Sequence, residues 1–356
     1  MNNKAIVLLS GGLDSTLAVR VLCDQGIEVV ALNFTSPFCN CGGRKEGCQH
    51  QAVKVARELN IPIRVFMKGL EYMKLVENPP HGYGSGMNPC IDCRIYILRK
   101  AKELMAEAGA SFVATGEVLG QRPMSQQRHT LAVIERESGL EGLILRPLSA
   151  LHFTPTIPER EGIVDRGKLL AISGRGRREQ IELAADLGIN DYPCPAGGCL
   201  LTEKSIAARL RDLFQHKPDY GMTDLHLLSV GRHFRLSPQL KIVVGRNETE
   251  NKKIVSLAGS KGNIFQPSLF RGPAAFADGC LNGASREVIG RIIAAYSQEN
   301  LPAYQLEEIS AGERKAVFTV EGRYPREQCD ILRIDDGIVK SPDAALRRIP
   351  RHCGVL

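Results

Sequence analysis

A glycine-rich loop near the start of the chain, SGGLDST at residues 10–16, has residue types that bind phosphate. Two adjacent glycines let the backbone approach an anion closely, and the N-terminus of a following helix offers unpaired N–H groups. The loop lacks the Lys that reaches the β- and γ-phosphates in P-loop NTPases, which favours a departing pyrophosphate as its ligand. A glycine-rich turn before a capped helix is the alternative. The predicted phosphate-binding residues are Ser10, Gly11, Gly12, Asp14, Ser15 and Thr16.

Two pairs of cysteines have the spacing of ligands. Cys90 and Cys93 form a C-x-x-C in NPCIDCR, and two thiolates at this spacing can bind one metal ion or one edge of a cluster. We expect the motif to lie just before a helix, whose N-terminus would lower the thiol pKa values. A second pair occurs in YPCPAGGCLLT at residues 192–202. The predicted catalytic residues are Asp14, Cys90, Cys93, Cys194 and Cys199, and these four cysteines are also the predicted metal ligands.

A third group of cysteines lies in CNCGGRKEGCQH at residues 39–50. Three cysteines and a histidine can bind zinc, although a C-x-C start is unusual spacing for a zinc site. A loop with unligated thiols is the alternative. The residues of this possible zinc site are Cys39, Cys41, Cys48 and His50.

A polar segment, TGEVLGQRPMSQ, follows the predicted strand at residues 111–116. In open parallel sheets the ligand binds at the carboxyl ends of the strands, so this segment predicts part of a nucleotide or base pocket. An ordinary polar loop is the alternative. The predicted pocket residues are Asn33, Thr115, Gly116, Glu117, Gln121 and Gln126.

The elements that must position these residues alternate between strand-like and helix-like runs in the first half of the chain. Short apolar, β-branched runs predict strands at residues 5–10, 28–34, 62–66, 111–116 and 142–148. Helices are expected at residues 14–25, 48–59 and 93–109 and after residue 176. Such alternation predicts an α/β fold with a parallel, doubly wound sheet covered on both faces.

The pattern changes after FQHKPDYGMTD at residues 214–224, which has the composition of a domain boundary. Strand-like runs at 227–236 and 240–246 follow, with helices at 248–258 and 286–298 and strands at 304–309 and 315–320. We therefore expect an N-terminal domain at residues 1–218 and a smaller α+β domain at residues 222–356.

Composition and charge restrict the classes of protein. The chain has 356 residues and a formal net charge of +7, which suits an RNA partner and suits a slightly basic enzyme equally well. The N-terminus lacks the features of a signal peptide, and no apolar run approaches the length of a membrane span. These features predict a cytoplasmic protein without a membrane partner. Basic residues at 173–178, SGRGRR, could contact RNA phosphates through Arg175, Arg177 and Arg178, or form a solvated helix start.

The motifs together resemble a known family. SGGLDS matches the signature of the PP-loop ATP pyrophosphatases, whose fold is the adenine nucleotide alpha hydrolase type. With NPCIDCR, TGEVLGQRPMSQ and LILRPL in the same order, residues 3–202 resemble the adenylation domain of ThiI-type tRNA 4-thiouridine synthetases. Residues 230–254 are similar to the RNA-binding domain of NFACT proteins, in the strand that ends in GRN and in the helix start that follows. The chain departs from the ThiI pattern because it begins at the first strand and shows no rhodanese-like segment at its end.

The resemblance implies an ATP-dependent tRNA sulfurtransferase that forms AMP and pyrophosphate. Adenylation turns a uridine carbonyl oxygen into a leaving group, and a sulfur nucleophile then replaces it. The implied cofactors are ATP, Mg²⁺ and a [4Fe–4S] cluster held by Cys90, Cys93 and either Cys194 or Cys199. A persulfide route or a zinc site would use the same thiols.

The implied partners are tRNA and a sulfur donor, either sulfide or the persulfide of a cysteine desulfurase. The sequence is also compatible with a homodimer. Two other functions fit the same residues: a PP-loop synthetase that acts on a small molecule, and a non-catalytic RNA-binding protein that senses nucleotide. The first would act without tRNA, and the second would release no pyrophosphate.

Overall fold

The apolar runs of the first half form one parallel sheet in the computed structural model, which describes residues 1–39, 48–192, 199–258, 262–310 and 312–334. The strand order is β3-β2-β1-β4-β5, and every pairing is parallel. β1, with the sequence KAIVL, lies at the centre and is buried along almost its whole length, as expected for a sheet covered on both faces. The five strands are β1 (Lys4–Leu8), β2 (Glu28–Thr35), β3 (Ile63–Met67), β4 (Phe112–Thr115) and β5 (Ile144–Leu145).

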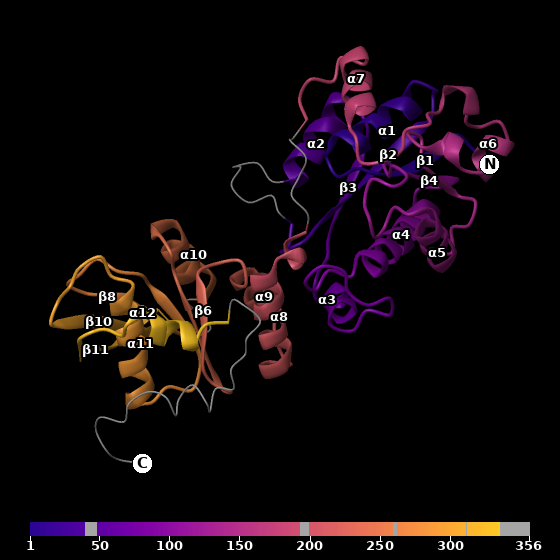
Figure 1. Cartoon of the computed structure of the whole chain (residues 1–356). Coiled ribbons are helices and arrows are strands. Elements are labelled where there is room, and N and C mark those ends of the chain that lie inside the picture. The colour runs from indigo at the N-terminus through magenta and orange to yellow at the C-terminus, as the bar shows by residue number, and fades with distance from the viewer. Residues whose placement is uncertain (40–47, 193–198, 259–261, 311, 335–356) are drawn as a thin grey trace. The chain divides into compact units, whose positions relative to one another are not determined.

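Helices cover the two faces of this sheet. Figure 1 shows α1 and α2 on one face and α4 and α5 on the other. Val19 and Leu22 of α1 pack with Ala52 and Val55 of α2 in one buried cluster, whereas helices α4 and α5 contribute to a second. The α-helices of this unit are α1 (Leu13–Cys23), α2 (Cys48–Glu58), α3 (Leu70–Glu77), α4 (Cys90–Glu107), α5 (Arg128–Ser138), α6 (Ile157–Arg160) and α7 (Arg178–Asp186). Short 3₁₀ helices occupy Ala150–His152, Arg166–Lys168 and Leu200–Thr202.

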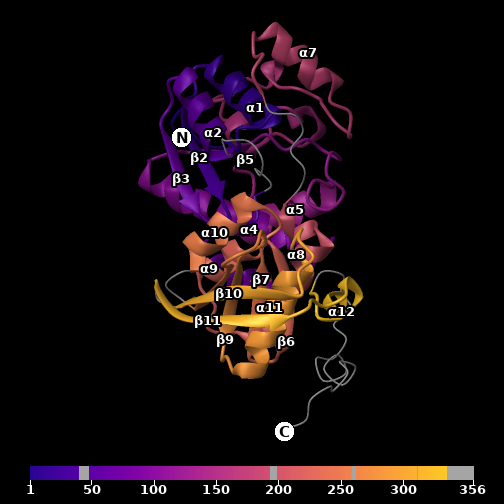
Figure 2. The same ribbon diagram turned by 90° about the vertical axis from the view of Figure 1, so that its left-hand side faces the viewer.

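The second half of the chain builds a six-stranded antiparallel sheet with the order β11-β10-β8-β9-β7-β6. Its strands are β6 (Arg232–Ser237), β7 (Leu240–Val244), β8 (Asn263–Pro267), β9 (Ala275–Gly279), β10 (Ala303–Ser310) and β11 (Glu313–Glu321). Figure 2 shows α11 and the strands β10, β11, β7, β9 and β6 of this unit. Its helices are α8 (Lys204–His216), α9 (Met222–Leu227), α10 (Glu248–Ala258), α11 (Gly283–Ala295) and α12 (Arg326–Ile331).

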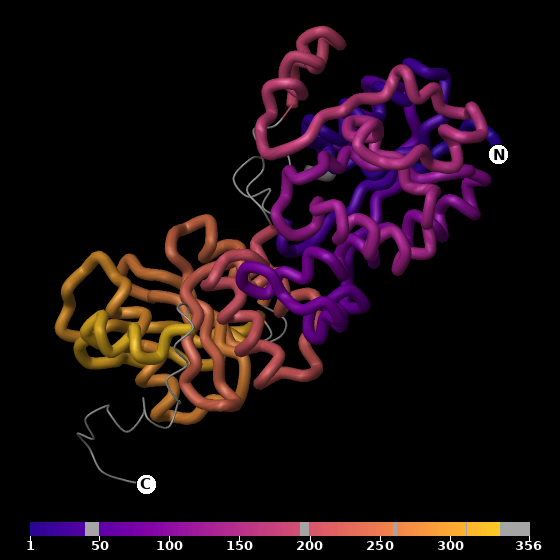
Figure 3. The backbone as a smooth tube through the Cα atoms, turned by 45° about the vertical axis from the view of Figure 1, so that its right-hand side comes forward, coloured from indigo at the N-terminus to yellow at the C-terminus, as the bar shows by residue number. Residues whose placement is uncertain are grey.

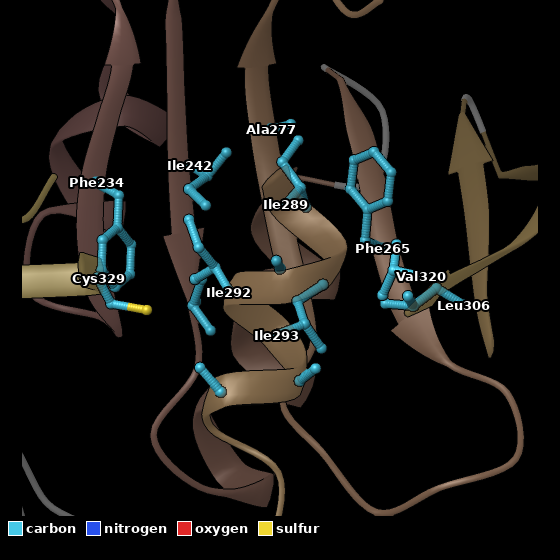
Figure 4. Close-up of a cluster of buried hydrophobic side chains, with 14 of the residues drawn as sticks. Phe234, Ile242, Phe265, Ala277, Ile289, Ile292, Ile293, Leu306, Val320 and Cys329 are labelled. Atoms are coloured by element: carbon cyan, nitrogen blue, oxygen red, sulfur yellow. The ribbon is translucent and has the colours of Figure 1, made fainter. Parts of the chain in front are cut away.

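The core of this second sheet lies between the strands and α11. Ile289, Ile292 and Ile293 of α11 pack against Ile242 and Phe265 of the strands (Figure 4). A separate cluster joins Ile254 of α10 to other strand side chains. The predicted fold class, a parallel α/β domain followed by a smaller α+β domain, is confirmed.

The boundary between the two units differs from the expected one. The chain divides into Met1–Thr202 and Glu203–Leu356, and the two units follow one another along the chain (Figure 3). The expected boundary at residues 218–222 is therefore corrected, because α8 belongs to the second unit. Asp212 of α8 pairs there with Arg235 at 2.7 Å and Lys241 at 3.1 Å. The segment that resembled a linker connects α8 to α9.

No helix in the described part of the chain combines the length and the apolar character needed to cross a lipid bilayer.

Candidate functional site

The glycine-rich loop connects the end of β1 to the start of α1. β1 lies at the centre of the sheet, where the order of the strands along the chain reverses. The side-chain hydroxyls of Ser15 and Thr16 donate to the Gly12 carbonyl oxygen at 2.9 and 3.1 Å, and Ser10 Oγ lies 3.1 Å from Ser15 Oγ. Gly12 is the N-cap, and α1 begins without a side-chain cap. The first amide groups of α1 therefore have no side-chain acceptor, and such groups at a helix start can bind an anion.

Two glycines are required where other segments touch this loop. Gly11 has a φ of +78°, and a Cβ there would lie 2.7 Å from the Ala52 backbone nitrogen. A Cβ on Gly116 would lie 2.6 Å from the Asp14 carbonyl. The loop is thus in close contact with α2 and with the end of β4, which is paired directly with β1. In a doubly wound sheet this reversal of strand order is where a ligand binds.

Asp14 joins three segments of the site. Its Oδ2 atom accepts a hydrogen bond from Gln121 Nε2 at 3.2 Å and lies 3.6 Å from Arg177 Nη2. Its Oδ1 atom is buried and has no hydrogen-bond partner among the described residues. A buried carboxylate oxygen without a donor suits a Mg²⁺ ion, because Mg²⁺ prefers oxygen ligands.

A buried ionic cluster follows the end of β4. Glu117 is almost fully buried; its Oε2 accepts from Thr115 Oγ1 at 3.1 Å and from Arg146 Nε at 3.3 Å. Arg94 Nε lies 3.4 Å from Glu117 Oε1, and Glu135 accepts from Arg146 Nη1 at 3.2 Å. Glu117 Oε1 and Arg146 Nη2 nonetheless make no hydrogen bond within the described chain.

Other predicted pocket residues are also buried and incompletely satisfied. Asn33 donates from Nδ2 to the Leu9 carbonyl at 2.8 Å, but its Oδ1 atom has no partner among the described residues. Gln126 Oε1 is likewise buried without a hydrogen-bond partner among the described residues. Native proteins rarely leave buried polar atoms unpaired, so a group of them at one edge of the sheet indicates a ligand.

Three arginines lie near Asp14 and the first C-x-x-C cysteine. Burial lowers the pKa of Arg122, and the positive charges of Arg94 and Arg177 lower it further. The charges of Cys90 and Asp14 act in the opposite direction on the same group. Arg122 is therefore within electrostatic range of both Asp14 and Cys90.

The C-x-x-C motif forms the first turn of α4 and does not precede the helix, as α4 begins at Cys90. Asn88 Nδ2 donates to Cys90 Sγ at 2.9 Å. Burial raises the pKa of Cys90, and the nearby charge of Cys93 adds to this effect. The expected lowering of the Cys90 pKa by the helix N-terminus is therefore wrong, because desolvation of the thiolate is the larger effect.

Asp92, between the two cysteines, fixes the segment that precedes α4. It accepts from the His81 backbone nitrogen at 3.1 Å and lies 2.8 Å from His81 Nδ1. Glu137 Oε1 lies 3.3 Å from the other ring nitrogen. These contacts hold His81 against the C-x-x-C motif.

Cys199 lies in the same neighbourhood although it is distant in sequence. Its Sγ donates to the Phe38 carbonyl at 3.6 Å, and burial raises its pKa to about 11. The charges that act on it include those of Lys68, Cys93 and Cys39. Cys199 is therefore within electrostatic range of Cys93 and Cys39.

Lys68, at the end of β3, is the shared neighbour of these thiols. Its Nζ lies 3.6 Å from Cys93 Sγ and 4.8 Å from the centre of the buried Tyr72 ring. Burial by itself lowers the pKa of Lys68, but the charges of Cys93, Cys199 and Cys39 outweigh it, so the pKa lies above its ordinary value. We call Cys39, Cys90, Cys93, Cys199, Lys68 and Tyr72 the thiol pocket.

Several predicted residues lie outside the described part of the chain. Cys194 and Cys41 belong to undescribed segments, as does the side chain of Cys48. The possible zinc group around Cys39 therefore stays a prediction. Within the described ranges, no three His, Cys, Asp or Glu side chains are arranged to hold a metal ion. Of the basic residues at 173–178, Arg177 meets Asp14, whereas Arg178 pairs with Glu182 on the surface.

Sequence reasoning missed several residues of this site. Three of them lie within quoted motifs, one follows a strand, and two lie within helices: Arg94, Arg122 and Arg146; Lys68; and Tyr72 and Glu135. Arg94 follows the C-x-x-C directly, and Arg146 lies within LILRPL. Lys68 follows the third predicted strand, so the rule for carboxyl ends of parallel strands could have identified it.

The fold and these residues define a class of protein, a doubly wound α/β domain with a glycine-rich loop at the point where its strand order reverses. Residues 1–155 match the model of the family described as "Thiamine biosynthesis protein (ThiI)". Residues 231–324 match the model described as "NFACT protein RNA binding domain". The first unit is thus similar to the ThiI family over residues 1–155, and the second unit is similar to the NFACT RNA-binding domain over residues 231–324.

Curated relatives match the first domain. The tRNA-specific 2-thiouridylase MnmA 1 of Caldanaerobacter subterraneus subsp. tengcongensis is 33% identical over 132 residues, which is 33% of this chain and 35% of that protein. A probable tRNA sulfurtransferase of Ureaplasma parvum serovar 3 is 30% identical over 154 residues, 42% of this chain and 37% of that protein. The chain thus spans about a third of the length of these relatives.

Solved structures show more distant likeness. The U34-tRNA thiolase NcsA from Methanococcus maripaludis with its [4Fe-4S] cluster is 16% identical, with a TM-score of 0.30, and the match covers 64% of this chain and 70% of that one. The NH3-dependent NAD synthetase from Campylobacter jejuni is 13% identical, with a TM-score of 0.29 over 64% of this chain and 83% of that one.

Proposed function

We propose that the chain is an ATP-dependent tRNA thiolase, which adenylates a uridine carbonyl oxygen and then replaces that oxygen with sulfur. The observation that carries this proposal is the meeting of Gln121 and Arg177 on Asp14 of the glycine-rich loop, at 3.2 and 3.6 Å, and the charges of both Asp14 and Cys90 act on the neighbouring Arg122. A nucleotide site and a sulfur site within range of one guanidinium can act on the same substrate atom. The matched families and the tRNA-modifying relatives support the same reaction.

In the first step the uridine oxygen attacks the α-phosphate of ATP, an O–P bond forms, and pyrophosphate leaves. The amide groups at the start of α1 would hold the departing pyrophosphate, and Asp14 would hold Mg²⁺ through its unpartnered oxygen. Arg94, Arg122 and Arg177 would neutralise the phosphate charge that develops. Asn33, Thr115, Gly116 and Gln121 complete the proposed nucleotide pocket.

In the second step a sulfur nucleophile attacks the adenylated carbon, a C–S bond forms, the C–O bond breaks, and AMP leaves with the oxygen. The thiol pocket holds this chemistry in our proposal. Lys68 contributes a partly buried cation beside Cys93, which would stabilise an anionic sulfur there. Burial keeps Cys90 and Cys199 protonated until sulfur or metal binds, because it raises both pKa values.

The all-cysteine donor set fits a [4Fe–4S] cluster in chemical type. Cys90 and Cys93 would supply two ligands, and Cys199 or Cys194 the third. Such a cluster, when bound, offers an iron without a protein ligand to a hydrosulfide. Sulfide and a cysteine desulfurase persulfide are the two proposed sulfur donors, and the proposed setting is the cytoplasm.

The test compares Cys90→Ala with Cys23→Ala, a matched control in α1 away from the pocket. Anaerobically purified protein is analysed for iron, sulfide and zinc, and then incubated with ATP, sulfide and unmodified tRNA. We expect about four irons per wild-type chain, pyrophosphate release that depends on tRNA, and thiouridine in the digested tRNA by mass spectrometry. Cys90→Ala should lose the iron and the thiouridine, and Cys23→Ala should keep both.

Other results would contradict the proposal in separate ways. Pyrophosphate release without tRNA would indicate a small-molecule synthetase, and no release under any condition would indicate a nucleotide sensor. If the chain contains zinc without iron and still thiolates tRNA, the proposed function stands and the proposed cluster is ruled out.

A further inference from the structure

Four arginines gather on the second unit from segments that are far apart in sequence. Arg232 begins β6, Arg246 follows β7, Arg326 begins α12 and Arg333 follows α12. Burial lowers the pKa of Arg232, and the positive charges of Arg333, Arg326 and Arg246 lower it further. Arg246, Arg326 and Arg333 are therefore each within electrostatic range of Arg232, although like charges repel.

Two of these arginines stack on one aromatic ring. The Cζ atoms of Arg232 and Arg326 lie 4.4 and 4.1 Å from the centre of the Tyr296 ring. Tyr296 follows α11, and its ring lies 6.1 Å from that of the fully buried Phe234. Stacking fixes the plane of a guanidinium and leaves its N–H edge available to a planar or tetrahedral oxyanion.

The charge balance of this cluster is incomplete. Arg246 pairs with Glu250 at 2.5 Å, and Arg333 lies 3.7 Å from Asp330. Within the described residues neither Arg232 nor Arg326 forms an ion pair with a carboxylate. Arg232 instead donates to the Gly245 carbonyl at 2.9 Å.

Another arginine of the same unit shows the contrast. Arg291 also stacks on a tyrosine, with its Cζ 5.7 Å from the centre of the Tyr324 ring. It is however paired with Glu287 at 2.9 Å. Stacking on a tyrosine is thus not by itself a sign of a binding group. Arg232 and Arg326 differ from Arg291 because the described residues give neither of them an ion-paired carboxylate.

We propose that Arg232 and Arg326, stacked on Tyr296, bind backbone phosphates of the RNA substrate. The inference rests on the proposed function, since it locates the RNA contact of the second unit. The matched RNA-binding model ends at residue 324, so it includes Arg232 and Tyr296 but not Arg326. The site therefore extends the RNA-binding surface onto α12. Phosphate fits this geometry because a guanidinium donates two parallel hydrogen bonds to it.

The test measures binding of bulk unmodified tRNA to the full chain over a series of KCl concentrations. The variants are Arg326→Gln, which changes an exposed residue, and the double variant Arg232→Gln/Arg326→Gln. We expect the double variant to bind about tenfold more weakly or worse, and its slope of log affinity against log salt to fall by about 2, one for each lost phosphate contact. Arg291→Gln is the matched control and should leave affinity and slope unchanged.

Circular dichroism melting of each variant shows whether it folds, and the exposed Arg326→Gln change keeps the test valid if the double variant does not. For the single variant we expect the salt slope to fall by about 1. Wild-type affinity and slope in a folded Arg326→Gln chain would overturn this site while the proposed function stands. A wild-type chain that binds no tRNA at low salt would contradict the proposed function, and the site with it.

Discussion

Each unit buries a carboxylate between two cations, but the two clusters differ in how completely they are satisfied. In the second unit, Arg235 donates to both oxygens of Asp212 at 2.9 and 2.7 Å, and Lys241 adds a contact at 3.1 Å. In the first unit, Glu117 meets Arg146 and Arg94 only at 3.3 and 3.4 Å. A hydrogen-bond partner is missing from Glu117 Oε1 and Arg146 Nη2 among the described residues.

This difference in hydrogen bonding distinguishes buried charges that stabilise the fold from buried charges that are available to bind a ligand. A buried ion pair with all its donors and acceptors used fixes its elements, here α8 against β6 and β7. A buried pair with unused polar atoms beside a phosphate loop leaves places for a ligand to complete. Unpaired buried atoms are also found on Asp14, Asn33 and Gln126, all of which belong to the proposed nucleotide pocket.

The largest expected effect is on stability in the second unit. Asp212→Asn leaves Arg235 and Lys241 buried without a counter-charge, so the free energy of unfolding of this unit should fall by about 3–5 kcal/mol. Urea unfolding followed by far-UV circular dichroism measures it, since the chain has no Trp. The exposed Glu287→Gln change is the control, and an equal shift in both variants would show that the Asp212 cluster is not structural.

The next effect is on catalysis in the first unit. Glu117→Gln should reduce tRNA-dependent pyrophosphate release about 100-fold, or about 2.7 kcal/mol in activation free energy. It should lower the free energy of unfolding by only about 1–2 kcal/mol, because Arg146 keeps Glu135 as a partner. The control is Glu141→Gln, at an exposed residue. A large loss of stability with unchanged turnover would reverse the assignment of the two clusters.

The smallest effect is a pH dependence of stability in the second unit, which Asp212 should cause. Burial by itself raises the pKa of Asp212, but its hydrogen bonds and ion pairs with Arg235 and Lys241 outweigh burial, so the pKa lies below its ordinary value of 3.8. A carboxyl with a lowered folded-state pKa contributes stability that is fully present above 3.8. That contribution is lost as the pH falls through the lower folded-state pKa.

The expected slope from this one group is at most about 1.4 kcal/mol per pH unit. Urea midpoints measured between pH 5 and the acid limit of the native state, compared for wild type and Asp212→Asn, provide the test. The variant should lack this part of the acid dependence. Identical acid profiles would mean that Asp212 does not stabilise the unit through its charge.

Much of the fold was predictable from local sequence pattern. Five apolar runs predicted the five parallel strands, and α1, α2, α4, α7, α10 and α11 lie close to their expected positions. The same pattern missed α3, α5 and α8, whose sequences mix polar and apolar residues without a strong boundary signal. It also placed the domain boundary too late, because the ion pairs of Asp212 connect residues more than twenty positions apart.

By itself, the sequence determined the phosphate loop, the C-x-x-C motif and the polar end of β4, because each depends on residue types a few positions apart. Only the tertiary structure decided which of them meet. It placed Gln121 and Arg177 on Asp14, Lys68 beside Cys93, and Arg232 and Arg326 on Tyr296. It also reversed the expected pKa direction of Cys90, since desolvation depends on everything packed around a thiol and not on its neighbours in the chain.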